Sequence, residues 1–286
     1  MTDQQENTGT FESSDGLKMF YRAYLAEKER ARLMIAHGIG EHSGRYDNVV
    51  HTLLPDGISV WAVDLRGHGK SGGRRGHISA FDQYRYDLLL ILRIAKEGMP
   101  EGRKCFLLGH SMGGLIALDF VIHYPDAVDG VVISSPSLGI TVKVPPAKKM
   151  LGKVMSSVLP GLTLANGLDV TKLSHDEQVV RAYVDDPLVH DRVSTRWFTE
   201  IVRTMEEVNE SASKVTVPIM IQVAGDDHLT DAARSQEFFA RLSVEDKSLH
   251  VYDGFYHEIY NEKEELRTKP LADLDAWVKD HCEEER

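Results

Sequence analysis

The chain has 286 residues, of which 42% are hydrophobic, and a formal net charge of −11 at pH 7. This length allows a sizeable buried core, and the negative charge disfavours nucleic acid as a general partner, because a phosphate backbone would be repelled. The first ten residues are polar and no run approaches the ~18 apolar residues of a membrane span, so we expect a cytoplasmic protein. Only Cys105 and Cys282 are present, which predicts no disulfide framework.

Six short apolar runs, taken in chain order, predict buried and mostly parallel strands. Helical patterns lie between most of them, including a helix capped by Ser79 and a last helix that begins near Pro270. Such a series is typical of an α/β protein with an open, mostly parallel sheet. The runs are RLMIAH (32–37), ISVWAVD (58–64), KCFLLGH (104–110), VDGVVISS (128–135), VPIMIQVAG (217–225) and SLHVYDG (248–254).

The interval between the fourth and fifth runs, residues 137–213, contains no strong strand pattern and several prolines. We interpret it as an inserted helical cap, with residues 1–136 and 214–286 forming the two parts of the core. Within it, PPAKKMLGKVMSSVLPGL (145–162) has one apolar face and one face of lysines and serines. This segment is interpreted either as a cap helix packed on the core or as a lid whose apolar side meets lipid, and the two interpretations are compatible.

The motif GHSMGG (109–114) follows the third run, where a Gly-X-Ser-X-Gly pattern at a strand-to-helix junction predicts a sharp turn that exposes a nucleophilic serine. Ser111 is that serine. Gly109 and Gly113 lack the Cβ atoms that would collide beneath the turn. The backbone N–H of Met112, at the start of the following helix, is expected to point towards a developing oxyanion.

A serine hydroxyl needs a base, and in this motif's fold an acid and then a histidine follow downstream. His257, in the loop after the last run, is the candidate base. Asp227 is the candidate acid, while Asp226 competes for that role and Asp231 is a weaker third choice; a member without a catalytic role would cap the next helix. The second oxyanion donor is expected in HGIGEHSGRY (37–46), at the N–H of Ile39.

The stretch RGHGKSGG (66–73) raises the question of a phosphate-binding loop, since it follows a strand and carries Gly-X-Gly-X-X-Gly. A Walker loop would need a glycine where Asp64 stands, and the glycines continue where a dinucleotide-binding helix should open. We therefore expect Asp64 to Ser71 to brace the sheet edge beside the oxyanion turn.

Together, HGIGEHSGRY, DLRGHGKSGGRRGHI, GHSMGG, LSHDEQVVRAYVDDPL, DDHLTD and YDGFYHE make the chain resemble an α/β-hydrolase of the monoacylglycerol lipase and lysophospholipase family. The resemblance implies an α/β-hydrolase fold, with helices flanking a mostly parallel central sheet and an inserted helical cap. It also implies a serine hydrolase that cleaves the carboxylic ester of monoacylglycerols, with the acyl chain in an apolar tunnel under the cap.

Alternatives to this function are a lysophospholipase, a broad carboxylesterase or thioesterase, and a ligand receptor built on a hydrolase fold. The resemblance places the polar head of the substrate near Glu41, Arg45 and Tyr46, for which the alternative is an ion-paired helix start. No metal or organic cofactor is expected, because side chains and backbone can supply all the chemistry. The expected partner is a lipid ester, with transient contact between the cap and a lipid interface.

Overall fold

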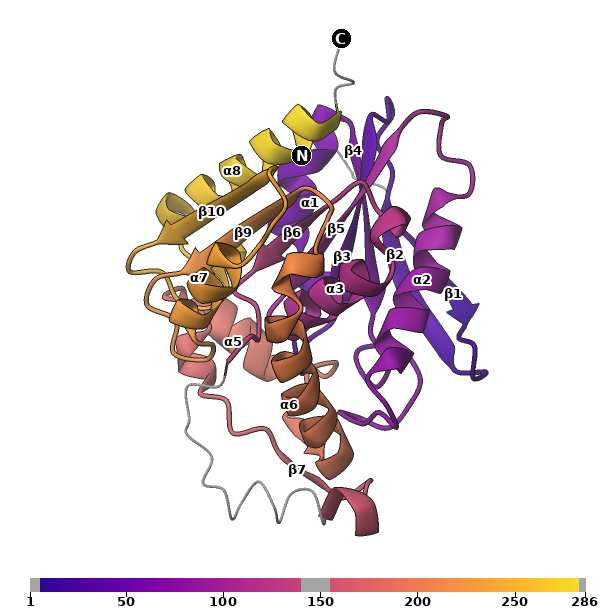
Figure 1. Cartoon of the computed structure of the whole chain (residues 1–286), viewed down its shortest axis with the longest axis vertical. Helices are drawn as coiled ribbons and strands as arrows, with labels where there is room; N and C mark the ends of the chain where they lie inside the picture. Colours follow the sequence, from indigo (N-terminus) through magenta and orange to yellow (C-terminus); the bar gives the residue numbers. More distant parts are fainter. Residues whose placement is uncertain (1–5, 140–154, 283–286) are drawn as a thin grey trace.

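The computed structural model describes residues 6–139 and 155–282 (Figure 1). Eight strands form one sheet in the order β1-β2-β4-β3-β5-β6-β9-β10, with antiparallel pairing at β1–β2 and β2–β4 and parallel pairing elsewhere. The molecule is thus an α/β-hydrolase fold with a mostly parallel central sheet, as expected. The strands are β1 (Glu6–Glu12), β2 (Lys18–Tyr24), β3 (Ala31–Ala36), β4 (Ile58–Asp64), β5 (Lys104–His110), β6 (Gly130–Ser134), β9 (Ile219–Ala224) and β10 (Lys247–Tyr252).

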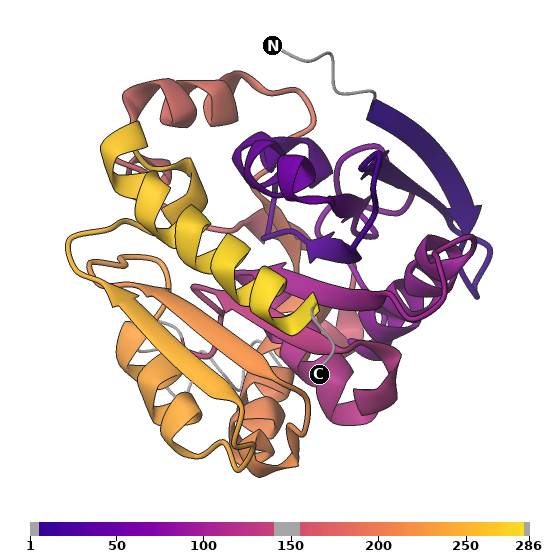
Figure 2. The same ribbon diagram turned by 90° about the horizontal axis from the view of Figure 1, so that it is seen from above.

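Helices cover both faces of the sheet, which is why the parallel strands are apolar on both sides (Figure 2). One face packs against α1 (Asp47–Leu53) and α8 (Glu264–Cys282). The other packs against α2 (Asp82–Lys96), α3 (Met112–His123) and α7 (Ala232–Ala240). Every residue of β3, β4, β5 and β6 is buried, apart from Lys104 at the start of β5.

All six strands predicted from apolar runs are confirmed, whereas the hairpin of β1 and β2 was not predicted. The sequence of β1, ENTGTFE, is largely polar because this strand lies at the exposed edge of the sheet, where only Phe11 is buried. A strand with little apolar surface gives no periodic signal, and its pairing with β2 is a tertiary contact.

Two predicted helix starts were wrong. The side chain of Ser79 does not cap α2. The backbone N–H of Ser79 instead donates to the side-chain oxygen of Gln83, at 2.8 Å. The last helix begins at Glu264, six residues before Pro270, which lies inside α8. The carbonyl of Pro270 accepts a hydrogen bond from the Gln222 side chain at 2.9 Å, so the helix interior is anchored on β9 at this point.

Where the structure describes it, the segment between β6 and β9 contributes no strand to the main sheet. Its described elements are a two-stranded antiparallel pair, two helices, two short 3₁₀ helices and the helical residues 155–158. Most of the predicted lid helix, residues 145–154, lies outside the described residues. They are β7 (Thr163–Ala165), η4 (Val170–Lys172), α5 (Glu177–Asp185), β8 (Arg192–Ser194), α6 (Thr195–Glu210) and η5 (Ala212–Lys214). In residues 6–139 and 155–282, no helix combines the length and apolarity needed to cross a bilayer.

Candidate active site

The turn between β5 and α3 carries Ser111 in a strained conformation, with φ 55° and ψ −117°. A Cβ at Gly109 would overlap the carbonyl oxygen of Gly113, and a Cβ at Gly113 would overlap the carbonyl oxygen of Ala36. Both glycines are therefore required by close backbone packing, as the sequence predicted. A backbone hydrogen bond fixes Ser111 in place, since its N–H donates to the carbonyl oxygen of Ser134 at 2.9 Å.

The structure brings Asp227 and His257 together from the loops after β9 and β10. Nδ1 of His257 lies 2.7 Å from Oδ2 of Asp227, and both side chains are buried. Asp226 instead is exposed and pairs with His228 at 3.4 Å, while Asp231 caps α7 by accepting from the N–H groups of Ala233 and Arg234. Of the three aspartates left open by the sequence, only Asp227 contacts His257.

The carboxylate of Asp227 has its acceptor positions filled. Its Oδ1 accepts the N–H groups of Leu229 and Thr230 at 2.8 and 2.9 Å, and its Oδ2 accepts the Thr230 hydroxyl at 2.8 Å. Burial opposes ionisation, but His257 and these donors outweigh it and lower the pKa of Asp227 to about 2. An ionised carboxylate is thereby held against the imidazole.

Two neighbouring histidines line the same cavity as Ser111. Their rings, His110 and His257, are 4.8 Å apart between centroids. Burial disfavours the charged form of His257, but the Asp227 carboxylate outweighs burial and raises the pKa of His257 above its ordinary value. Burial and the neighbouring His257 lower the pKa of His110 to about 4. Of the two rings, His257 is therefore the one suited to accept a proton near neutral pH.

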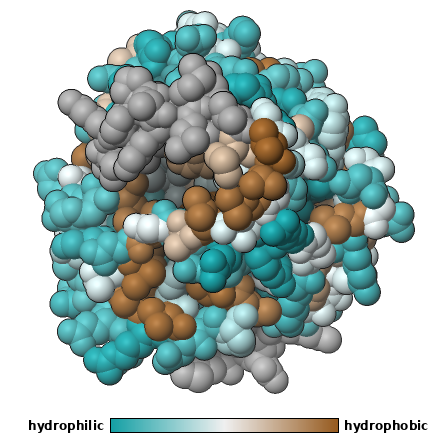
Figure 3. Space-filling model, turned by 90° about the horizontal axis from the view of Figure 1, so that it is seen from below, coloured by the Kyte–Doolittle hydropathy of each residue, from teal (hydrophilic) through white to brown (hydrophobic). Residues whose placement is uncertain are grey.

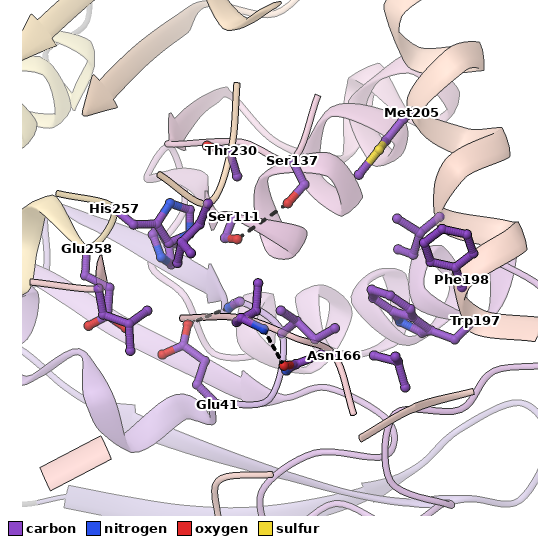
Figure 4. A pocket seen from close by; sticks show the side chains of 18 of the residues that line it. Glu41, Ser111, Ser137, Asn166, Trp197, Phe198, Met205, Thr230, His257 and Glu258 are labelled. Carbon is purple, nitrogen blue, oxygen red and sulfur yellow. Dashed lines mark hydrogen bonds between the residues drawn. The ribbon is translucent and has the colours of Figure 1, made fainter. Parts of the chain in front are cut away.

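Ser111 and His257 both line one cavity of about 160 Å³ (Figure 4). The only side-chain hydrogen bond of Ser111 within the described residues is with Ser137 Oγ, at 3.5 Å, so the hydroxyl is not bonded to His257 here. Catalytic hydrogen bonds are often long or unformed without substrate. The ring of His257 uses Nδ1 for Asp227, which leaves Nε2 as its only nitrogen available to the cavity.

The turn after β3 carries the predicted oxyanion donor Ile39, which lines the cavity together with Gly38. Its neighbour Gly40 has φ 76°, a conformation that favours glycine. Met112 is the first residue of α3, so its N–H has no partner within the helix. Ile39 thus lies at the cavity and Met112 follows Ser111 directly, and their role as an oxyanion hole stays a prediction.

Buried ion pairs hold the residues expected to contact a polar head group. Glu41 accepts hydrogen bonds from the Gly38 N–H at 2.5 Å, from Tyr46 Oη at 2.8 Å and from Arg45 at 2.8 Å. Arg45 also makes a bidentate pair with Glu258, at 2.6 and 2.8 Å. Although burial opposes ionisation, Arg45 and the nearby histidines lower the pKa of Glu41 to about 2.

Of these three expected residues, only Glu41 lines the cavity. Arg45 and Tyr46 donate their hydrogen bonds to the carboxylates of Glu41 and Glu258. These contacts agree with the alternative interpretation of an ion-paired helix start. A direct contact between the head group and Glu41 stays a prediction.

The glycine loop after β4 braces the site. Asp64 accepts the N–H of Ser43 at 2.8 Å and the N–H of Lys70 at 2.7 Å, which ties the loop to the oxyanion turn. The buried ring of His37 adds a second tie, because its Nε2 accepts the N–H of Leu65 at 2.9 Å. Loop N–H groups that could have bound an anion donate to protein oxygens instead, at residues 67, 68, 70, 71 and 72.

Four residues near the site were not identified from the sequence. His110 and Thr230 touch members of the Asp227–His257 pair, Glu258 holds Arg45, and Glu262 lies behind the His257 loop. Glu258 follows the candidate base directly in the chain, so its position alone could have drawn attention.

In the described residues, no group of three or more His, Cys, Asp or Glu side chains is arranged to hold a metal ion.

Comparison with known proteins matches residues 27–264 to the family described as serine aminopeptidase, S33. A monoacylglycerol lipase of Mycolicibacterium smegmatis is 31% identical, with 98% of this chain and 100% of the relative covered. Phospholipase YtpA of Bacillus subtilis is 33% identical, over 84% of this chain and 93% of the relative. The crystal structure of Paleococcus ferrophilus monoacylglycerol lipase superposes with a TM-score of 0.84 at 35% identity, covering 92% of this chain and 99% of that one.

The family match spans most of the chain, and the relatives align along nearly their whole lengths. The sequence motifs, the fold and these relatives agree with one another. The chain therefore belongs to the serine aminopeptidase S33 family and is an α/β-hydrolase of the monoacylglycerol lipase family.

Proposed function

We propose that the protein is a serine hydrolase that cleaves monoacylglycerols into fatty acid and glycerol. The observation that carries this proposal is the arrangement around one cavity, which a strained Ser111 and the buried His257 both line, while Asp227 contacts Nδ1 of the imidazole. This combination is what a serine hydroxyl needs in order to attack an ester.

In the proposed mechanism, Nε2 of His257 removes the proton of Ser111 as Oγ attacks the ester carbonyl. The N–H groups of Ile39 and Met112 stabilise the oxyanion. The imidazolium, stabilised by Asp227, then gives its proton to the departing glycerol oxygen, leaving an acyl-enzyme. Water repeats the sequence, so that the fatty acid leaves and Ser111 recovers its proton.

The apolar part of the cavity supports an acyl chain as the bound group. Helix α6 contributes five apolar side chains, and the segment before α5 contributes Leu168 and Leu173. Each buried methylene of a chain lying there would contribute about 0.8 kcal/mol, so a long chain gains most. The α6 residues are Trp197, Phe198, Ile201, Val202 and Met205 (Figure 4).

The charge of the cavity favours a neutral head group over a phosphate. Glu41 and Glu258 both line it, and no lysine or arginine does so among the described residues. Arg45 neutralises one of these two carboxylates. An anionic phosphate would therefore be desolvated next to a net negative charge, with no cation among the described lining residues to bind it. We propose that Glu41 instead accepts hydroxyl hydrogen bonds of the glycerol, while Arg45 and Tyr46 hold Glu41 in place.

A panel of oleoyl esters that differ only in the head group tests this function. We expect kcat/KM to be highest for monooleoylglycerol, lower for oleoyl-lysophosphatidylcholine, and lowest for anionic oleoyl-lysophosphatidate, by at least about tenfold overall, because an uncompensated buried charge costs several kcal/mol. Turnover would be measured as fatty acid released.

The panel also separates the rival functions. A preference for lysophosphatidylcholine would replace the proposal by a lysophospholipase; the Bacillus relative is named a phospholipase. Turnover confined to short activated esters or to thioesters would point to a carboxylesterase or thioesterase instead.

We further propose that residues 137–213 form a cap on a core of residues 1–136 and 214–286, and that this cap touches a lipid interface when the protein associates peripherally with a membrane. The cap end of the molecule exposes Val158, Leu159, Leu162 and Leu164 (Figure 3). Exposed apolar side chains gathered at one end are typical of a lipid-binding surface.

The double variant Leu159→Ser/Leu164→Ser tests this contact. We expect less co-sedimentation with phosphatidylcholine vesicles and unchanged turnover of a short soluble ester, because neither side chain lines the cavity. Val184→Ser, which changes an exposed valine of α5, is the matched control. Equal vesicle binding by wild type and the double variant would refute the contact.

A further inference from the structure

The loop that carries His257 is held by contacts other than the one between His257 and Asp227. Two of its backbone N–H groups donate to residues outside the loop: that of Glu258 to the carbonyl of Leu173, at 2.8 Å, and that of Tyr256 to Oε1 of Glu262, at 2.9 Å. Since these two residues flank His257, the position of its backbone depends on both contacts.

Glu262 is fully buried and binds two segments at once. Besides the Tyr256 N–H, its Oε1 lies 2.7 Å from Nδ1 of His175, and its Oε2 accepts the backbone N–H of His175 at 2.9 Å. The hydroxyl of Ser174 lies 3.3 Å from Oε2. A single side chain thus connects the His257 loop to residues 173–175, which precede α5 in the region between β6 and β9.

Stacked rings reinforce this connection. The ring of His175 lies on that of Tyr256, with centroids 3.6 Å apart and planes 23° from parallel. Residues 173–175 and 256–258 are therefore joined by a backbone hydrogen bond, by the Glu262 carboxylate and by a ring stack. Leu173 and His257 both line the cavity, whereas Glu262 does not.

We propose that Glu262 is a positioning residue, which sets the imidazole of His257 for proton transfer by fixing its loop against residues 173–175. It touches no reacting atom. This inference rests on the proposed function, and it adds a residue on which the geometry of the base depends. A displacement of about 1 Å at a catalytic group can cost about 10²-fold in rate, so a support of this kind has a measurable effect.

Glu262→Gln is the test, because it keeps the shape of the side chain while its NH₂ group would face N–H donors. We expect kcat to fall about 10- to 100-fold with little change in KM, since the base moves and the acyl-binding surface does not. The rate constant for labelling Ser111 with a fluorophosphonate should fall by a similar factor. The matched control is Glu265→Gln, which changes an exposed glutamate at the start of α8 and should behave as wild type.

A second variant keeps the inference testable if Glu262→Gln folds poorly. His175→Phe preserves a ring on Tyr256 but removes the hydrogen bond to Oε1, and this side chain is one-third exposed. We expect a smaller loss of kcat, and a double variant whose effect is less than the product of the two single effects, because both act through one contact.

The proton resonance of His257 Nδ1–H supplies a readout that does not need turnover. It should shift or broaden in Glu262→Gln at a temperature where the variant is folded. A variant with a lower melting temperature but unchanged kcat, labelling rate and resonance would overturn the inference, since Glu262 would then only stabilise the fold. If wild type neither turns over esters nor is labelled, the proposed function fails instead, and the resonance still tests the support of the loop.

Discussion

Ser111→Ala is expected to lower ester turnover by about 10⁴-fold or more and to abolish labelling by a fluorophosphonate, because the attacking oxygen is removed. The fold should persist: alanine is smaller, and the backbone of Ser111 is held by hydrogen bonds with Ser134, Leu115 and Ser137 that the change leaves in place. Turnover of monooleoylglycerol, labelling and the melting temperature would be measured together.

Ser79→Ala, a change at an exposed serine remote from the cavity, is the control for this experiment. Retained turnover in Ser111→Ala would disprove the proposed nucleophile. If wild type binds a lipid ester without hydrolysing it, and Ser111→Ala binds it equally well, a receptor on a hydrolase fold becomes the better explanation.

Asp227→Asn is expected to lower kcat by about 10⁴-fold, since the amide can hold the wrong imidazole tautomer and cannot stabilise the imidazolium. Asp226→Asn is the matched control one residue away, and its exposed carboxylate pairs only with His228 among the described residues, so it should behave as wild type. The comparison decides between two neighbouring aspartates that the sequence alone could not separate. A larger loss of kcat in Asp226→Asn than in Asp227→Asn would show that Asp226, not Asp227, is the acid.

The dependence of kcat/KM on pH in the wild type should also reflect the Asp227 carboxylate. The base must begin neutral, and Asp227 raises the pKa of His257 above 6.5, so kcat/KM should fall with decreasing pH along a limb that lies above pH 6.5. Any residual activity of Asp227→Asn should show this limb at lower pH, because the charge that favours the imidazolium is gone. A flat profile from neutral to acidic pH would contradict His257 as the base.

The sequence was informative wherever function constrains a few neighbouring residues. Ser111 and its two glycines lie within five positions, and their conformation follows from local crowding, so the motif alone indicated the turn. The apolar strands were likewise readable, because burial on both faces requires continuous hydrophobic runs. His257 was found from its place after the last such strand.

Contacts between distant segments had no equivalent signal. Arg45 and Glu258 are 213 positions apart, and His175 and Glu262 are 87 apart, so nothing in the local pattern pairs them. Glu41 illustrates the consequence: the sequence proposed it with Arg45 and Tyr46 for one role, and the folded chain divides them between the cavity and the layer behind it.

By itself, then, the sequence determined the fold class and predicted Ser111 as the nucleophile and His257 as the base, because each depends on short-range backbone geometry or on continuous apolar runs. Only the tertiary structure decided that Asp227, not Asp226, contacts His257, that the described cavity lining carries carboxylates without a cation, and that Glu262 contacts the loop of His257. These depend on where side chains from separate loops converge, and that convergence is set by the packing of the whole sheet and its helices.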